Sequence, residues 1–534
     1  MPSARRSSAA CWRRRSSPRC SCRCSIAGSP GLASGASAPP RCPPVRLRGA
    51  IMPEASGTRH RLRWARMTGI ALAILLGGCV VTRIDPQVPE QTLPDALSEP
   101  IETSVSLPDP WWRMFEDPVL DELIDEALAN NPDVSIAAAR VAEARAGLRI
   151  ANADRLPSID VRSDATRTKD SEILSVPGFE RTRTLYTVQG AVAYELDFWG
   201  RYQRASEAAR AQLLATEYGR EATKLSLTGA VARRYFALLA SAQQLARARA
   251  TLADREEALR LEQLRFDAGE SDELTLKRAE ADTAATRTRV HQLELELTRN
   301  SNALGVLLGR PPRELVDNAI VARTMQLVDA PLLPPSLPSA VLTRRPDIGA
   351  AEAALQAAAA DIGVARALLF PRISLTGVFG SVSPELSDLF TTPMEAWSAT
   401  GGLLQPIFQG GRLRANVART EAVRAQRQGE YVRTVQVAFR EVLDALRGQG
   451  QIAGVREASA QQVAALERAT ELAQLRYDQG DIAYLELLDA RRTLFQAEID
   501  LIAARRDALL NAVDLALAVG GGIGERAEPL SARR

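Results

Sequence analysis

The longest regular pattern in the chain is helical, and it occurs twice. No proline interrupts residues 178–310 or 407–528. Within each stretch a Gly-Arg pair opens a continuous helical pattern, residues 201–268 and 412–479. At about 1.5 Å rise per residue, each predicted helix is roughly 100 Å long. Such a helix needs neighbours along its whole length, because one of its ends cannot fold back to cover the other.

Shorter predicted elements flank each long helix in the same order. Helical patterns at 134–153 and 348–368 come first, and returning helices at 273–308 and 484–519 come last. Between them, apolar and polar residues alternate, which predicts strands because successive strand side chains point to opposite faces. The predicted strands are residues 159–165, 183–198, 373–380 and 396–404. The residues expected to share an apolar face within their strands are Tyr186, Val188, Val192, Tyr194, Leu196, Ile373, Leu375, Phe379, Trp397, Ala399 and Leu403.

The repeated order indicates an internal duplication. Asn131-Pro132-Asp133 returns as Arg345-Pro346-Asp347 after 214 positions, and Gly200-Arg201 returns as Gly411-Arg412 after 211 positions. A period of this length is too long for a solenoid repeat of about 20–50 residues. We therefore expect one half at residues 111–310, a Pro-rich linker at 311–343 and a second half at 344–524, followed by a disordered tail at 525–534.

Basic residues and cysteines are concentrated before the first half. Residues 1–51 contain ten Arg, no Asp or Glu, and five of the six cysteines. A Ser/Pro/Arg-rich segment with few large apolar residues cannot build a core. We interpret it as a non-native or disordered extension upstream of a true start at Met52.

Residues 52–78 have the order of a secretory signal peptide: basic residues, a short apolar run and small residues. Leu76-Gly77-Gly78-Cys79 resembles a bacterial lipobox, which implies cleavage before Cys79 and lipidation of that cysteine. The alternatives are a plain signal peptide and a buried cysteine. Val80 in place of Asp favours the outer membrane among lipoproteins of this kind. The Pro-rich residues 79–110 predict an extended, lipid-anchored arm.

Removing residues 1–78 changes the charge and the available chemistry. The remaining chain has 53 basic and 63 acidic residues, so its net charge is −10 and nucleic acid is not an expected partner. It keeps one cysteine, Cys79, and one histidine, His291, so an internal disulfide is impossible. Few residues remain that could carry out His- or Cys-based catalysis. We expect no enzymatic activity, no cofactor and no metal site.

The strand count suggests a pore shared between chains. Four strands cannot close a barrel, since the smallest transmembrane barrels have about eight. Open strand edges do not persist in lipid. A dimer would supply eight strands and a trimer twelve, and the long helices would extend such a barrel as a second tube. The competing hypothesis is a periplasmic coiled-coil lipoprotein scaffold without a pore.

Several motifs resemble the outer-membrane efflux proteins (TolC-like), and most closely the NodT-type lipoprotein branch that serves resistance-nodulation-division (RND) pumps. The motifs are Trp111-Trp112 through Asp117-Pro118, Asn131-Pro132-Asp133, the segment 194–201 (YELDFWGR), the segment 344–348 (RRPDI) and the segment 405–412 (QPIFQGGR). The resemblance covers roughly residues 109–521. It implies a mainly α fold with a small membrane β part, and a homotrimer with a twelve-stranded barrel in the outer membrane.

The resemblance also implies a function and its partners. The chain would be the passive outer-membrane conduit of a tripartite efflux pump, working with a periplasmic adaptor protein and an RND-type inner-membrane pump. Drugs and other toxic small molecules would be its cargo. A protein-export channel of the type I secretion kind is the alternative within the same fold.

In this family the periplasmic tip of the helical barrel is the gate. The resemblance implies that copies of Leu485 form an apolar constriction at this tip and that copies of Asp489 form an acidic ring. The two residues are four positions apart and share one helical face. It assigns the contacts that hold the tip closed to Arg476, Tyr477 and Arg492. The structural alternative is that Asp489 and Arg492 form an ordinary solvated pair. The positions implied for tip packing and adaptor docking are Phe266, Asp267, Gly269 and Gly480.

Overall fold

The computed structural model describes residues 110–174, 180–311, 327–331 and 344–521. The chain separates into two units, Met1–Met67 and Thr68–Arg534, and every described residue belongs to the second. The expected extension, signal peptide, lipidation site Cys79 and tail lie outside the described residues, as do most of the arm and the linker.

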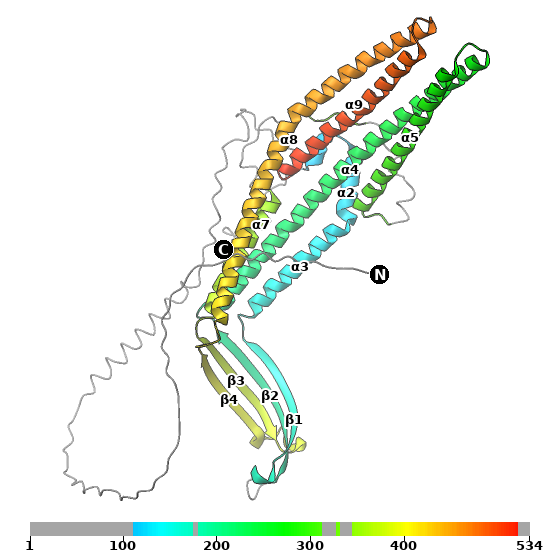
Figure 1. Cartoon of the computed structure of the whole chain (residues 1–534). Coiled ribbons are helices and arrows are strands. Elements are labelled where there is room, and N and C mark those ends of the chain that lie inside the picture. The colour runs from blue at the N-terminus through cyan, green and yellow to red at the C-terminus, as the bar shows by residue number, and fades with distance from the viewer. Residues whose placement is uncertain (1–109, 175–179, 312–326, 332–343, 522–534) are drawn as a thin grey trace, which may run out of the picture. The chain divides into compact units, whose positions relative to one another are not determined.

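The described residues form two halves, and from α3 and α7 onward their α-helices and strands follow the same order (Figure 1). The first half contains η1 (Trp111–Phe115), α2 (Pro118–Asn130), α3 (Pro132–Ala153), β1 (Ser158–Lys169), η2 (Glu172–Leu174), β2 (Thr182–Leu196), α4 (Arg201–Asp267) and α5 (Glu273–Leu307). The second half contains α7 (Pro346–Ala367), β3 (Arg372–Ser383), η4 (Leu386–Asp388), η5 (Thr392–Met394), β4 (Glu395–Leu404), α8 (Arg412–Asp478) and α9 (Tyr484–Ala518). The helices and strands predicted from the residue pattern are confirmed, with boundaries shifted by at most four residues.

Corresponding helices in the two halves have equal lengths. There are 67 residues in α4 and in α8, 35 in α5 and in α9, and 22 in α3 and in α7. Their starting positions differ by 214 residues for α3 and α7 and by 211 for the other two pairs, as in the sequence. The duplication therefore holds element by element.

The four strands form one antiparallel sheet in the order β1-β2-β3-β4. Directly paired residues of an antiparallel sheet lie on the same face. Val192 pairs with Ile159 on one side and with Gly377 on the other, and Gly377 pairs in turn with Ala399. The same pairing, continued along all four strands, places every residue that the sequence assigned to an apolar strand face on one face of the sheet. Ile159 and Val161 lie on that face as well.

This apolar face is open rather than packed. Ile159 is 75% exposed, Phe379 62% and Trp397 77%. The opposite face carries mostly polar and small residues, among them Asp160, Arg162, Asp164, Gln189, Glu195, Ser374, Thr376 and Thr400. Within the described residues, β1 and β4 each keep one edge without a strand partner. A polar face, an apolar face and two open edges are what one section of a membrane barrel would have.

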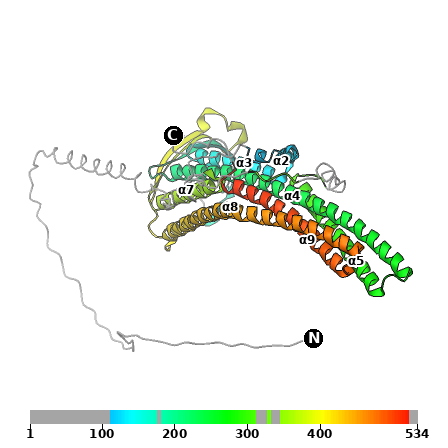
Figure 2. The ribbon, with the colours of Figure 1, turned by 90° about the horizontal axis from the view of Figure 1, so that it is seen from above.

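The long helices pack as two antiparallel hairpins, α4 with α5 and α8 with α9 (Figures 1 and 2). In addition, α9 contacts α4, and α7 contacts both α4 and α8. By length and hydropathy α7 could cross a membrane, but half of its apolar window is buried, as expected for a core helix. Strands β2 and β4 lead into α4 and α8, so the sheet lies at one end of the hairpins and their turns at the other.

The largest apolar cluster joins the N-terminal elements to the middle of the hairpins. Trp111 and Phe115 of η1 pack with Phe236 of α4, Leu304 of α5 and neighbouring residues of α9. This cluster fixes η1 and α2 against three of the four long helices.

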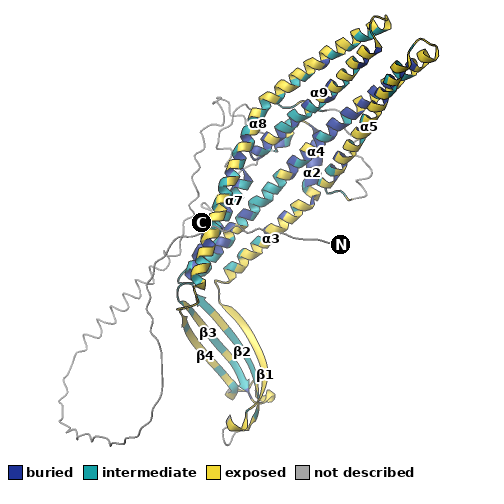
Figure 3. Cartoon of the chain, viewed as in Figure 1, coloured by how far each residue is buried: buried dark blue, intermediate teal, exposed yellow. Residues whose placement is uncertain are grey.

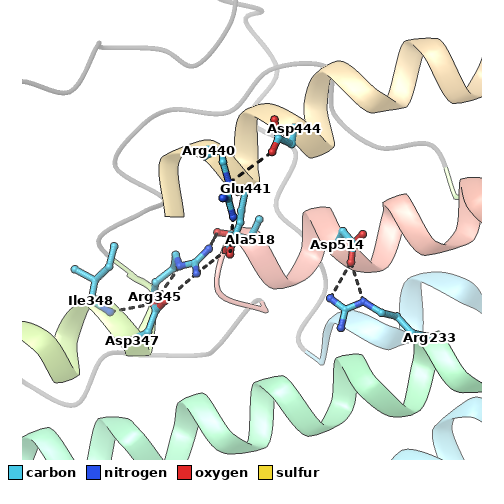
Figure 4. A network of polar contacts seen from close by, with 9 residues as sticks. All are labelled: Arg233, Arg345, Asp347, Ile348, Arg440, Glu441, Asp444, Asp514 and Ala518. Carbon is cyan, nitrogen blue, oxygen red and sulfur yellow. Dashed lines mark hydrogen bonds and ion pairs between the residues drawn. The ribbon is translucent and has the colours of Figure 1, made fainter. Parts of the chain in front are cut away.

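In each half one polar side chain joins the start of one helix, α3 or α7, to the end of the last helix, α5 or α9. Arg345 donates from Nε and Nη2 to the Asp347 carboxylate and from Nη1 to the Ala518 backbone oxygen at 2.9 Å, and it pairs with Glu441 at 2.8 Å (Figure 4). At the corresponding position of the first half, Asn131 donates its amide to the backbone oxygen of Leu307 at 2.8 Å. Leu307 and Ala518 are the last residues of α5 and α9. Each half is thus closed at the same place by a different donor.

Replacing Asp117 by Ala is expected to lower the free energy of unfolding by about 2–4 kcal/mol. Asp117 caps α2 by accepting from the Val119 and Leu120 amides, and such a cap is worth about 1 kcal/mol. It also accepts from the buried Tyr235 hydroxyl at 2.7 Å, and losing a buried hydrogen bond costs about 1–3 kcal/mol. Thermal unfolding in detergent measures the change. Asp133→Ala at the exposed start of α3 is the control, and equal melting temperatures for the two variants would contradict the assignment.

Candidate functional site: the tip of the long hairpins

Both hairpin turns have the same backbone. Gly269 and Gly480 follow α4 and α8 with φ of 78° and 80°, a left-handed conformation that glycine adopts without strain. At the first turn the Gly269 amide donates to the Phe266 oxygen and the Glu270 amide to the Arg265 oxygen. The second turn repeats these two bonds 211 positions later. This is the Schellman motif, which satisfies the last carbonyl groups of a helix.

The helices that leave the two turns begin differently. The Asp272 carboxylate accepts from the Thr275 amide at 2.7 Å and so caps α5. This hydrogen bond lowers the pKa of Asp272 below its usual value. Ala483 occupies the corresponding position before α9 and supplies no side-chain cap. The start of α9 therefore lacks a stabilising contact that the start of α5 has.

Tyr477 of α8 joins the second hairpin to the first. Its hydroxyl donates to Glu262 Oε1 at 2.6 Å and accepts from Arg265 Nη1 at 2.8 Å, both on α4. Glu262 is only 4% exposed and also forms an ion pair with Arg265 at 3.2 Å. Burial raises the pKa of Tyr477 well above its usual value, and the hydrogen bond to Glu262 adds to the rise. The hydroxyl therefore stays protonated near neutral pH and remains a donor to Glu262.

Arg492 of α9 makes a second contact between the hairpins. Its Nε lies 2.6 Å from Oδ1 of Asp282 on α5, and Arg255 Nε of α4 lies 3.0 Å from Oδ2 of the same carboxylate. The Arg255 contact is an ion pair by distance, but its atoms are not aligned as a hydrogen bond. Burial lowers the pKa of Arg255, and the Asp282 charge opposes that change. The alternative pair between Asp489 and Arg492 is not formed, because Arg492 binds Asp282 instead.

The other predicted residues of the tip are exposed. Leu485 is 46% exposed, and the Asp489 side chain is exposed one turn further along α9. Arg476 is exposed and has no side-chain hydrogen bond or ion pair within the described part of the chain. Phe266 is 36% exposed, and Asp267 accepts from the Gln263 amide at 3.0 Å. Of the three residues expected to make tip contacts, Tyr477 and Arg492 bridge the two hairpins and Arg476 does not.

Sequence reasoning missed the acceptors of these contacts. Glu262 and Asp282 are two carboxylates among many on charged helices, and their residue types alone do not distinguish them. A periodicity signal was available, because Glu262 lies 14 positions after the buried Ala248, and Asp282 lies three positions after the buried Ala279. No group of three or more His, Cys, Asp or Glu side chains in the described ranges is placed to hold a metal ion. The chemistry of the tip is therefore that of side-chain contacts between helices.

Comparison with known proteins identifies the family. The family described as outer membrane efflux protein matches residues 123–310 and 337–521. The solvent efflux pump outer membrane protein SrpC of Pseudomonas putida is 37% identical over 418 residues, covering 77% of this chain and 87% of SrpC. The probable outer membrane lipoprotein SilC of Salmonella typhimurium is 33% identical over 462 residues, covering 86% of this chain and 98% of SilC.

A solved structure has the same fold. The CmeC outer membrane channel of Campylobacter jejuni superposes with a TM-score of 0.79 at 26% identity, covering 84% of this chain and 96% of CmeC. The fold expected from the sequence, a mainly helical TolC-like channel with four strands per chain, is confirmed. The chain belongs to the outer membrane efflux protein family and is an outer-membrane channel of an efflux system.

Proposed function

We propose that three copies of the chain form a passive conduit across the outer membrane for drugs and other toxic small molecules. The observation that carries the proposal is the four-stranded sheet, with its open apolar face and its two unpaired edges. Three such sheets supply twelve strands, within the range of known transmembrane barrels. The helical hairpins continue each sheet and would form a tube some 100 Å long in the periplasm.

The conduit works as the outer component of a tripartite pump. A periplasmic adaptor protein and an RND-type inner-membrane pump supply the cargo, and the channel lets it diffuse outward without catalysis. SrpC is named for solvent efflux, which supports small apolar molecules as one class of cargo. SilC is named a probable lipoprotein, which supports lipidation of Cys79, a residue outside the described part of the chain.

The gate of the conduit lies at the hairpin tip. Three copies of Leu485 narrow the passage, and three copies of Asp489 form an acidic ring, an arrangement that selects and gates ions in pores generally. Tyr477 and Arg492 hold α8 and α9 against the first hairpin through Glu262 and Asp282. Arg476 is assigned to the same closed state. The exposed turns around Gly269 and Gly480, with Phe266 and Asp267, are the docking surface for the adaptor.

Reconstitution tests the conduit directly. The purified protein is expected to run as a detergent-stable trimer and to conduct ions in planar bilayers. A monomeric, non-conducting protein would instead favour a coiled-coil scaffold. Co-purification from membranes would identify the adaptor and pump, and a secretion ATPase in their place would favour protein export.

The double variant Leu485→Ala and Asp489→Ala is expected to raise single-channel conductance at least about twofold, because it widens the constriction and removes the acidic ring. The duplication offers a matched control. Leu274→Ala and Arg278→Ala change the corresponding positions of α5, outside the proposed gate, and are expected to leave conductance unchanged. Identical conductance in the gate variant and the parent channel would count against the assignment.

Tyr477→Phe is expected to increase the open probability of the channel by about 5–30-fold, since a lost hydrogen bond to a buried carboxylate is worth about 1–2 kcal/mol. The variant keeps the ring, and phenylalanine already occupies the corresponding position 266. Tyr431→Phe, on the same helix and far from the tip, is the control. Single-channel recording measures the effect, and a Tyr477→Phe channel that gates like the control would remove Tyr477 from the closing contacts.

Phe379→Arg is expected to reduce assembly into the outer membrane strongly, because arginine on a lipid-facing barrel position costs about 2–4 kcal/mol near the bilayer centre. Thr376→Arg lies on the opposite face of the same strand and would face water inside the barrel, so it is expected to assemble normally. Fractionation of membranes and quantification of the folded trimer measure both. Equal assembly of the two variants would mean that the apolar face does not meet lipid.

A further inference from the structure

Burial becomes sparse toward the hairpin turns, and charged residues make up part of what stays buried there (Figure 3). After Thr251, the structure describes two buried residues in α4, and both are charged: Arg255 and Glu262. Glu262 is partnered by Tyr477 and Arg265. The contacts of Arg255 are less complete.

The guanidinium group of Arg255 has more donors than acceptors. Its side chain is 5% exposed, and its Nε lies 3.0 Å from Oδ2 of Asp282 without the alignment of a hydrogen bond. Its Nη1 has no hydrogen-bond partner in the described part of the chain. A buried donor without an acceptor costs free energy, and the cost is larger for a charged group. The environment of Arg255 therefore favours a further acceptor.

Positive charge exceeds negative charge around Arg255. Burial lowers the pKa of Arg255, the Asp282 charge opposes that change, and the nearby charges of Arg491 and Arg492 lower the pKa further. Arg492 shares the Asp282 carboxylate with Arg255. Arg491 donates from Nη2 to the neutral amide oxygen of Gln474 and forms no ion pair within the described ranges. Three guanidinium groups are thus in contact with one carboxylate.

A pocket of about 350 Å³ lies beside two of these arginines. Thr251 and Arg255 line it from α4, and Arg491 lines it from α9. A water molecule occupies about 30 Å³ in the liquid, so the pocket has room for a polyatomic anion together with several water molecules.

The other charged residues that line this pocket are Arg247, Asp254, Glu257 and Glu498. Arg247 pairs with Glu498 at 2.5 Å, and Glu257 pairs with Arg260 at 2.7 Å. Asp254 is exposed. The arginine charges that no carboxylate of the pocket lining neutralises are therefore those of Arg255 and Arg491.

We propose that this pocket binds a small tetrahedral oxyanion of the phosphate class between Arg255 of α4 and Arg491 of α9. The planar guanidinium fork matches the oxygen geometry of such an anion, and the Thr251 hydroxyl supplies a further donor. A phosphate group carries nearly two negative charges near neutral pH, which matches the two arginines. The bound anion joins the two hairpins, as the contact of Arg492 with Asp282 does. The site lies within one chain and does not depend on the proposed conduit.

The duplication shows that the shared fold does not account for these charges. In the other half, the positions that correspond to Arg255, Asp282, Arg491 and Arg492 hold Leu466, Thr493, Glu280 and Ala281, respectively. The other half therefore forms the same helices with none of the four residues, so their grouping belongs to this pair of helix faces.

Isothermal titration calorimetry of the full-length protein in detergent, with inorganic phosphate at constant ionic strength, tests the site. The parent protein is expected to bind one phosphate per chain saturably. Arg491→Gln is expected to weaken binding at least about tenfold, because it removes hydrogen bonds between two charged groups. Arg505→Gln makes the same charge change at an exposed position of α9, 14 residues or roughly 20 Å away, and is expected to bind like the parent.

Leu494→Glu tests the pocket without removing an arginine. Leu494 lines the pocket one turn after Arg491, so the new carboxylate is expected to occupy the site and to weaken phosphate binding at least about tenfold. Melting temperatures confirm that each variant is folded, and phosphate is expected to raise the melting temperature of the parent and of Arg505→Gln more than that of Arg491→Gln. No saturable binding to the parent, or equal affinity in the parent and either folded pocket variant, would overturn the site. These measurements need no conducting channel, so they are decided separately from the conduit.

Discussion

Strand edges cannot be left open in hydrocarbon, where no water is present to satisfy backbone amide and carbonyl groups. The sheet of this chain has one apolar face, which suits lipid, but β1 and β4 each keep a free edge within the described residues. The chain therefore carries the surface of a membrane protein without the closure that such a surface requires. Sister copies are the simplest source of the missing edges, because an edge strand of the same sheet has matching length and alternation.

The helices face the same requirement in another form. A helix of 67 residues cannot be covered by its own ends, so each long helix depends on neighbours along its length, which for α4 come from both halves. The largest buried cluster, which includes Tyr235, Phe236 and Leu304, joins the first half to α9 of the second. It is poorer along α3 and α8, at the free sides of the chain. The free edges of β1 and β4 and the poorly buried helices α3 and α8 thus lie on the same two sides of one chain.

The sequence was most informative about elements and least informative about partners. Within the proline-free runs, the opening Gly-Arg pairs and the closing Gly269 and Gly480 located the long helices to within a residue, since proline and glycine act through the local backbone. The pairing of β2 with β3 could not be read from alternation, because many neighbours would satisfy the same pattern. At the tip, Tyr477 and Arg492 could be named from a resemblance. Their acceptors depend on how two hairpins pack, which local sequence does not encode.

Joining two halves in one chain has a consequence for the tip. A ring of six identical halves would have six equal boundaries, whereas a ring of three duplicated chains has two kinds that can diverge independently. Across the boundary inside the chain, Tyr477 bonds to Glu262. The corresponding residues are Phe266, which has no hydroxyl, and Ala473, which has no carboxylate. In the proposed trimer this directional bond is confined to every second boundary, so any opening of the tip has threefold rather than sixfold symmetry.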